Sequence, residues 1–269
     1  MPSSADSRLP FSELEARYRR LRRFGVRVRE VACVGAPRTL LVAEAGEAAR
    51  PCVSISAGVH GDEPAAPWAL LSLLEDGLLD PRFAYRAWPC TNPTGYAART
   101  RANAEGSDIN RSFSRGGTTP EAKAIVTANR DRRFALSLDL HEDVEATGFY
   151  CYEPAHSWSA APAILQALDD AGLPVQTFAP DFELGYPADA DHLRVLERGR
   201  VIPDFAAEAA FYPGLPYSLY IRKKAAQHVL TLEAPATQPW DLRIATLRVA
   251  VVAAIARLAK VSPAGDAKE

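Results

Sequence analysis

The feature that most constrains the fold is the alternation of apolar, β-branched segments with segments of helical periodicity. Residues 26–34, 39–45 and 52–59 are rich in β-branched and apolar residues and are separated by Gly and Pro, which predicts strands. The next segment, 63–79, has the pattern of a mostly buried helix, and 85–90 has that of another short strand. A helix that follows a strand and precedes another predicts an α/β fold.

The rest of the chain continues this pattern. Further helices are predicted at 11–24, 120–131, 160–171 and 239–259, and further extended segments at 134–140, 149–152, 175–178 and 229–232. The polar stretch 91–119 is predicted to be a long functional loop, and 186–220 is too rich in Pro, Gly and aromatic residues to predict an element. No linker or repeat interrupts the sequence, so we expect 1–269 to form a single domain.

Composition narrows the class of function. The chain is 48% hydrophobic and 24% charged, as in an average soluble globular protein. A net charge of −2 offers little to attract a nucleic acid or an anionic membrane, so a small-molecule or peptide substrate is favoured. With no signal peptide or membrane segment in the sequence, we expect a cytoplasmic protein. The four cysteines form no CxxC pair, which predicts buried free thiols.

Three candidate metal ligands stand at the ends of predicted strands. The strand 52–59 runs into the sequence GVHGDEP, which places His60 and Glu63 where open α/β sheets bind ligands. His141 follows a second apolar strand, and two imidazoles with one carboxylate can hold zinc and leave a position for water. Asp139, two residues earlier on the same strand face, is a predicted partner for the imidazole N–H of His141.

The segment between Glu63 and His141 contains further short motifs that narrow the choice of protein family. It reads NPTGYAARTRANAEGSDINRSF, so that HxxE, NPxG, an arginine, DxNR, a histidine after a strand and a late glutamate occur in that order. This order, from His60 to Glu233, resembles the zinc carboxypeptidase superfamily, which includes peptidases and the aspartoacylase and succinylglutamate desuccinylase branch. The resemblance implies a three-layer fold with a mixed, mostly parallel central sheet flanked by helices, and one zinc ion per chain.

The resemblance also assigns roles to individual residues. It makes His60, Glu63 and His141 the zinc ligands, and it makes Asn110 and Arg111 the pair that grips a substrate carboxylate. The chemistry agrees, because a guanidinium offers a planar fork for a carboxylate and an amide adds a donor.

Two further roles concern the reaction. Arg101 corresponds to the arginine that polarises the scissile carbonyl, although Arg99 is close enough in sequence to be the match instead. Glu233, which ends the apolar strand VLTLE, corresponds to the general base that takes a proton from the attacking water.

The sequence departs from the family pattern at several positions. Asp62 stands where the peptidases often carry an arginine, and Glu142 and Asp143 make an unusually acidic HED after the third ligand, which could repel acidic substrates or bind cations. The family's mobile tyrosine has several candidates and is left open. They are Tyr212, Tyr217 and Tyr220.

Together these features predict a zinc-dependent hydrolase that cleaves an amide bond next to a free carboxylate. The leading substrate is the C-terminal residue of a short peptide, and the alternative is an N-acyl amino acid. A non-catalytic ligand-binding homologue is less favoured, because the metal ligands and Glu233 are both present. The sequence predicts neither the accepted side chain or acyl group nor the oligomeric state.

Overall fold

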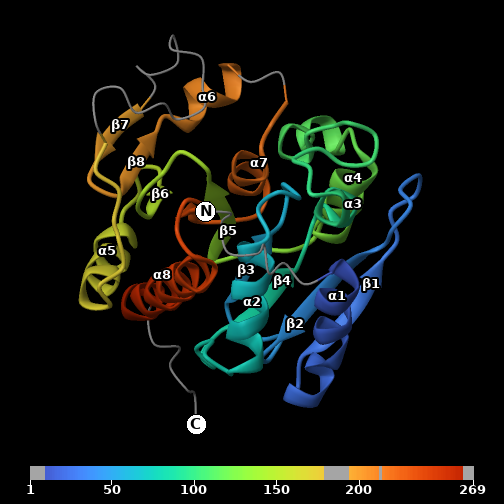
Figure 1. Cartoon of the computed structure of the whole chain (residues 1–269), viewed down its shortest axis with the longest axis horizontal. Coiled ribbons are helices and arrows are strands. Elements are labelled where there is room, and N and C mark those ends of the chain that lie inside the picture. Colours follow the sequence, from blue (N-terminus) through green and yellow to red (C-terminus); the bar gives the residue numbers. More distant parts are fainter. Residues whose placement is uncertain (1–9, 179–193, 212–213, 263–269) are drawn as a thin grey trace, which may run out of the picture.

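A computed structural model of the protein describes residues 10–178, 194–211 and 214–262 (Figure 1). Its centre is a nine-stranded sheet in the order β1-β2-β4-β3-β5-β9-β6-β8-β7. The strands are β1 (Arg27–Val31), β2 (Leu40–Ala45), β3 (Cys52–Ala57), β4 (Ala84–Trp88), β5 (Leu136–Asp143), β6 (Tyr150–Tyr152), β7 (Arg194–Glu197), β8 (Arg200–Pro203) and β9 (Val229–Pro235). Four adjacent strands at the centre of the sheet run parallel to one another: β4, β3, β5 and β9. This parallel centre with antiparallel pairs toward the edges confirms the predicted mixed sheet.

Helices cover both faces of the sheet. They are α1 (Phe11–Arg20), α2 (Ala65–Glu75), α3 (Pro93–Ala98), α4 (Pro120–Ala128), α5 (Ala161–Asp170), α6 (Phe205–Phe211), α7 (Tyr217–Lys224) and α8 (Trp240–Val261), with short 3-10 turns η1 (Leu21–Phe24), η2 (Ile109–Arg111) and η3 (Ser114–Gly116). Helices α1, α2, α5 and α8 share one apolar core with the sheet, and α4 and α7 share a second core on its other face. The arrangement confirms the predicted three-layer α/β fold.

Helix α2 shows how the sequence determines this packing. Nine of its eleven residues are buried, because it lies between α1, α8 and the sheet. A helix that is apolar on every side is stable only where every side is covered. Helix α8 packs against α2, α5 and strand β9 of the sheet.

Two strands run further than the sequence predicts. Strand β5 continues to Asp143 and β9 continues to Pro235, because His141, Glu142 and Asp143 keep pairing with Glu233 and its neighbours. The candidate ligand His141 and the candidate base Glu233 are therefore held by the sheet itself. They do not lie in loops beyond it.

The prediction of one long loop over 91–119 is wrong in part, because this stretch contains α3, η2 and η3. Asn92 caps α3 by accepting a hydrogen bond from the backbone N–H of Gly95 at 2.8 Å, and Pro93 occupies the first turn. Asp108 caps η2 in the same way, accepting from the N–H of Asn110 at 2.7 Å. Asn, Asp and Pro are typical of loops, but here they begin short helices.

The structure also tests the predictions for segments 175–178 and 186–220 and for the cysteines. Segment 175–178 forms only an isolated bridge between Phe149 and Val175, and no regular strand. Of the unassigned 186–220, the structure describes β7, β8, α6 and α7, while 186–193 and 212–213 lie outside the described residues. The four cysteines are free thiols, as predicted, and all but Cys52 are buried. No helix in the described ranges has the length and apolarity needed to cross a membrane.

A close backbone approach fixes the turn that follows β3. A Cβ atom on Gly61 would lie 1.9 Å from the carbonyl carbon of Gly95, so the turn rests directly on α3. The backbone N–H of Asn92 donates to the carbonyl oxygen of Gly58 at 2.9 Å and adds to this contact. Only glycine allows the two segments to lie this close.

We therefore expect Gly61→Ala to lower the free energy of unfolding by about 3 kcal/mol, because the methyl group would overlap the backbone of α3. Gly77→Ala is the control: its Cβ would meet nothing within 4 Å, and only its left-handed φ of 64° is unfavourable. That control should cost about 1 kcal/mol. Urea denaturation of both variants gives the comparison, and equal costs would show that the approach of the two segments is not a constraint.

Candidate metal centre

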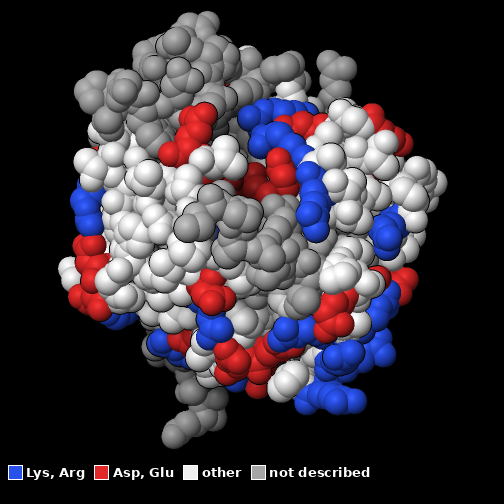
Figure 2. All heavy atoms as spheres, viewed as in Figure 1, with Lys and Arg blue, Asp and Glu red and all other residues white. Residues whose placement is uncertain are grey.

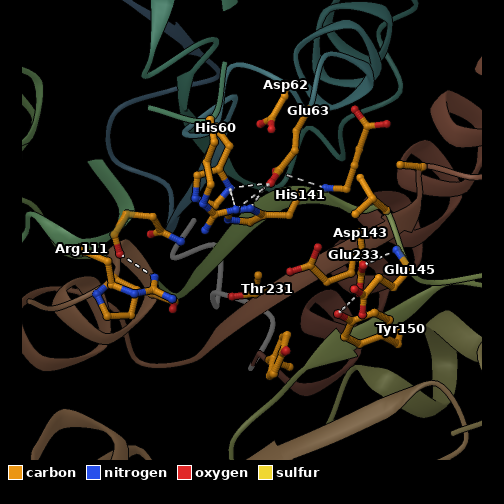
Figure 3. A pocket seen from close by; sticks show the side chains of 18 of the residues that line it. His60, Asp62, Glu63, Arg111, His141, Asp143, Glu145, Tyr150, Thr231 and Glu233 are labelled. Carbon is orange, nitrogen blue, oxygen red and sulfur yellow. Dashed lines mark hydrogen bonds and ion pairs between the residues drawn. The ribbon is translucent and has the colours of Figure 1, made fainter. Parts of the chain in front are cut away.

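Three buried side chains converge at the carboxyl-terminal edge of the central strands (Figure 3). His60 and Glu63 come from the turn between β3 and α2, and His141 comes from the end of β5. The Nδ1 atoms of His60 and His141 lie 2.5 and 2.9 Å from the two carboxylate oxygens of Glu63. The donor atoms of all three residues lie within 4.8 Å of one another.

The far nitrogen of each imidazole faces a second carboxylate. His141 Nε2 lies 3.2 Å from Asp139 Oδ2, so the contact predicted from the sequence is present. Ser56 Oγ on the neighbouring strand donates to Asp139 Oδ1 at 2.5 Å and holds that carboxylate in place. His60 Nε2 lies 3.5 Å from Asp108 Oδ1, a contact not predicted from the DxNR motif. Such outer carboxylates orient metal-binding imidazoles.

This group fits a divalent metal ion. Two imidazoles and one carboxylate form the donor set typical of a zinc site that keeps a position for a further ligand. With Asp139 beside His141 Nε2 and Asp108 near His60 Nε2, the Nδ1 atoms of both rings face the Glu63 carboxylate. All three side chains are almost fully buried, where a cluster of polar groups needs strong partners.

The electrostatics of the cluster are those of a site that attracts a cation. Burial acts to raise the pKa of Glu63, but the adjacent rings of His60 and His141 more than offset it and hold this pKa well below its usual range. Burial also acts to lower the pKa of His141, yet the carboxylate of Glu63, above all, keeps it raised. Burial raises the pKa of Glu233 to about 8, and the negative charges of Glu63 and Asp143 act in the same direction.

Glu142 ties the ligands to two helices. Its carboxylate accepts from the backbone N–H of Ala65, at the start of α2, at 2.5 Å and from Arg243 Nη1 of α8 at 2.8 Å. Its own backbone N–H donates to Glu63 Oε2 at 3.2 Å. Burial raises the pKa of this carboxyl to about 7. Within the acidic HED sequence, the Glu142 side chain is therefore buried and bonded to α2 and α8.

The cluster opens into a cavity of about 500 Å³. Arg101 lies at its wall, with Nη1 3.3 Å from His60 Nδ1 and Nε 3.2 Å from Asp108 Oδ2. Arg99, the alternative match, does not line the cavity; it ends α3 in a left-handed conformation with φ of 60° and is exposed.

The other predicted site residues also reach this cavity. Asn110 and Arg111 line it from η2, and Glu233 lines it from β9, opposite His141 in the strand register. The side-chain oxygen of Asn110 accepts from the backbone N–H of Tyr217 at 2.9 Å, which leaves its amide nitrogen as the donor for a ligand. The structure thus brings together every site residue chosen from the sequence.

The tyrosine left open is not found among the described candidates. Tyr217 is buried with its hydroxyl 3.2 Å from Ser54 Oγ, Tyr220 stacks on Phe113, and neither lines the cavity. Tyr212 lies outside the described residues. The tyrosines that do line the cavity are Tyr150 and Tyr152 of β6, and the hydroxyl of Tyr150 donates to Asp143 Oδ2 at 2.7 Å. No sequence signal distinguishes these two tyrosines from ordinary strand aromatics.

Comparison with known proteins agrees with this geometry. Residues 49–181 match the Succinylglutamate desuccinylase/Aspartoacylase catalytic domain family, and this range includes the three candidate ligands. Among curated proteins, Carboxypeptidase SOL1 of Arabidopsis thaliana is 34% identical over 113 residues. That match covers 35% of this chain and 23% of the relative, so the chain spans about a quarter of the curated protein.

Solved structures share the fold over nearly the whole chain. Proteins from Shewanella denitrificans OS217 and Shewanella amazonensis SB2B, both described provisionally as metallopeptidases, superpose with TM-scores of 0.71 and 0.69. They are 22% and 26% identical and cover 93% and 92% of this chain and 90% and 92% of their own. A metallo-carboxypeptidase from Burkholderia cenocepacia is 19% identical with a TM-score of 0.66, and covers 93% of this chain and 70% of its own.

We expect Asp139→Asn to weaken metal binding by about 10- to 100-fold, because the amide holds the His141 ring less firmly than a carboxylate. Chelator competition measures the affinity. Asp169→Asn, which removes an exposed carboxylate paired with Arg198, is the control and should bind metal as the wild type does. Equal affinity in the two variants would show that Asp139 does not orient a ligand.

Proposed function

Because this chain is a member of the zinc carboxypeptidase-like superfamily, we propose that it is a zinc-dependent hydrolase that cleaves an amide bond next to a free carboxylate. One observation carries the proposal: the His60, Glu63 and His141 donors, the Glu233 carboxylate and the Asn110–Arg111 pair all face one cavity. A cavity of about 500 Å³ suits a substrate the size of a short peptide or an acylated amino acid.

His60, Glu63 and His141 would hold the metal. When bound there, a zinc ion would supply Lewis-acid chemistry at the substrate carbonyl and would make a water molecule more acidic. The chain's contribution is to keep the two Nδ1 atoms and the carboxylate directed at one point, through Asp139, Asp108 and the backbone N–H of Glu142.

Glu233 would be the general base. It is partly buried at the cavity wall, opposite His141 in the strand register. From this position it would take a proton from the attacking water and return it to the leaving amine. The nearby Glu142 is less suited, because its carboxylate already accepts from Ala65 and Arg243.

The arginines would bind the substrate. Arg111 and the amide nitrogen of Asn110 would hold the substrate carboxylate, and Arg101 at the ligand cluster would stabilise negative charge that develops on the carbonyl oxygen. The turn that carries Asn110 and Arg111 is capped by Asp108 and lies directly against Gly214, where a Cβ atom would be 1.8 Å from the carbonyl oxygen of Arg111.

Two substrate classes fit this geometry. The C-terminal residue of a short peptide is the leading candidate, and the similar metallo-carboxypeptidase structure favours it. An N-acyl amino acid is the second, because the matched family is the succinylglutamate desuccinylase and aspartoacylase domain. A non-catalytic binding protein would have no need of both the donor cluster and Glu233.

We expect hydrolysis to require a free substrate carboxylate. An amidated analogue would lose the charge-assisted contact between the substrate carboxylate and the Arg111 guanidinium, which should lower kcat/KM by about two orders of magnitude or more. The assay uses zinc-loaded protein on a panel of dipeptides and N-acyl amino acids, each beside its C-terminal amide. Failure to cleave any member of the panel would contradict the proposed function. Equal cleavage of acid and amide would contradict only the proposed binding of the substrate carboxylate by Asn110 and Arg111.

Glu233→Gln should lower kcat by about two to four orders of magnitude, because the amide cannot accept a proton from water. Zinc content should stay at the wild-type level, since the three donors are unchanged. Glu47→Gln removes an exposed carboxylate far from the cavity and serves as the matched control. Near wild-type turnover in Glu233→Gln would place the base elsewhere, and loss of zinc would make Glu233 a ligand.

A further inference from the structure

The two ends of the cavity carry opposite charge. Arg111 lies on one side of the metal-binding residues, and Asp143 and Glu145 lie on the other (Figure 3). Acidic groups are visible in the hollow at the centre of this face, with basic groups along one side of it (Figure 2). A substrate that spans the cavity therefore meets positive charge at one end and negative charge at the other.

Neither carboxylate of the acidic end is neutralised by an ion pair among the described residues, and that of Asp143 is held in position by hydrogen bonds. Asp143 accepts from the hydroxyl of Tyr150 at 2.7 Å and from the backbone N–H of Glu145 at 2.8 Å. Glu145 is exposed at the cavity. Within the part of the chain that the structure describes, neither carboxylate forms an ion pair, whereas the neighbouring Glu142 is paired with Arg243.

The proposed function sets the direction in which a substrate lies, and the following step rests on it. With the substrate carboxylate at Asn110 and Arg111 and the scissile carbonyl beside His60, Glu63 and His141, the acyl half extends toward Asp143 and Glu145. Glu233 stands beside them. A negatively charged acyl group would be repelled there, and a cationic one would be attracted.

We propose that the acyl half of the substrate carries a positive charge near the scissile carbonyl, and that Asp143 and Glu145 recognise it. Two groups provide this charge: the free α-ammonium group of a dipeptide, or a basic side chain on the residue before the scissile bond. The same charges disfavour succinylated and other acidic acyl groups. The acidic end of the cavity thus selects peptides over N-acyl amino acids.

The test compares substrates that share one accepted C-terminal residue and differ only in the acyl half. They are an alanyl dipeptide, its N-acetyl and N-succinyl derivatives, and the N-acetyl-lysyl dipeptide. At low ionic strength, kcat/KM should be roughly tenfold higher for a cationic substrate than for the N-acetyl-alanyl one. The N-succinyl substrate should be the slowest, and added salt should reduce the differences, because these carboxylates are reached by solvent.

Whichever cationic substrate is preferred identifies the source of the charge. Equal kcat/KM across the series, or a preference for the succinyl group, would overturn the inference and leave the proposed hydrolase intact. Failure to cleave any of the four, together with the whole earlier panel, would instead contradict the proposed hydrolase.

Variants of Glu145 separate recognition from a structural role. Glu145→Gln should reduce the cationic preference by roughly threefold, mainly through KM, and Glu145→Lys should reverse it in favour of the N-succinyl substrate. Glu47→Gln makes the same change in net charge as Glu145→Gln, but away from the cavity, and should keep the wild-type ratio of kcat/KM between cationic and N-acetyl-alanyl substrates. A wild-type ratio in Glu145→Lys, with an unchanged melting temperature, would overturn the assignment.

Discussion

The pairing of β5 with β3 on one side and β9 on the other is the constraint on which the site depends. Parallel strands bring their carboxyl ends to one edge, and the register sets His141 opposite Glu233. A slip of one residue in β5 would turn His141 to the opposite face and leave Glu63 without its second imidazole. Because the strands continue past these residues, the sheet fixes the relative position of ligand and base more firmly than a loop would.

Around this edge, the buried carboxylate of Glu63 organises the remaining contacts. It faces both imidazoles and accepts the backbone N–H of Glu142, whose side chain in turn joins α2 to α8. A carboxylate in such a position is stable only while its partners remain. Packing of the terminal helix and geometry of the candidate metal site are therefore linked through one residue, Glu142.

The sequence predicted those parts of the site that depend on local pattern. His60, Glu63 and His141 stand at strand ends, where an apolar run stops and a polar residue begins, and the family pattern added Asn110, Arg111 and Glu233. The sequence could not predict those parts of the site that depend on contacts between distant segments. Arg101 reaches the donors and Arg99 does not because α3 ends at Arg99 in a left-handed turn, and the Glu142–Arg243 pair spans 101 residues. Likewise, Asn92 and Asp108 look like loop residues until the helices they cap are seen.

The proposed activity requires one divalent metal ion at His60, Glu63 and His141. Elemental analysis of the purified protein, before and after chelation and reconstitution with zinc, tests it most directly, with the His141→Ala variant measured alongside. We expect about one zinc ion per chain in the wild type, removed by chelator, restored on reconstitution and lost in the variant. No zinc after reconstitution, or undiminished tight binding by His141→Ala, would contradict it.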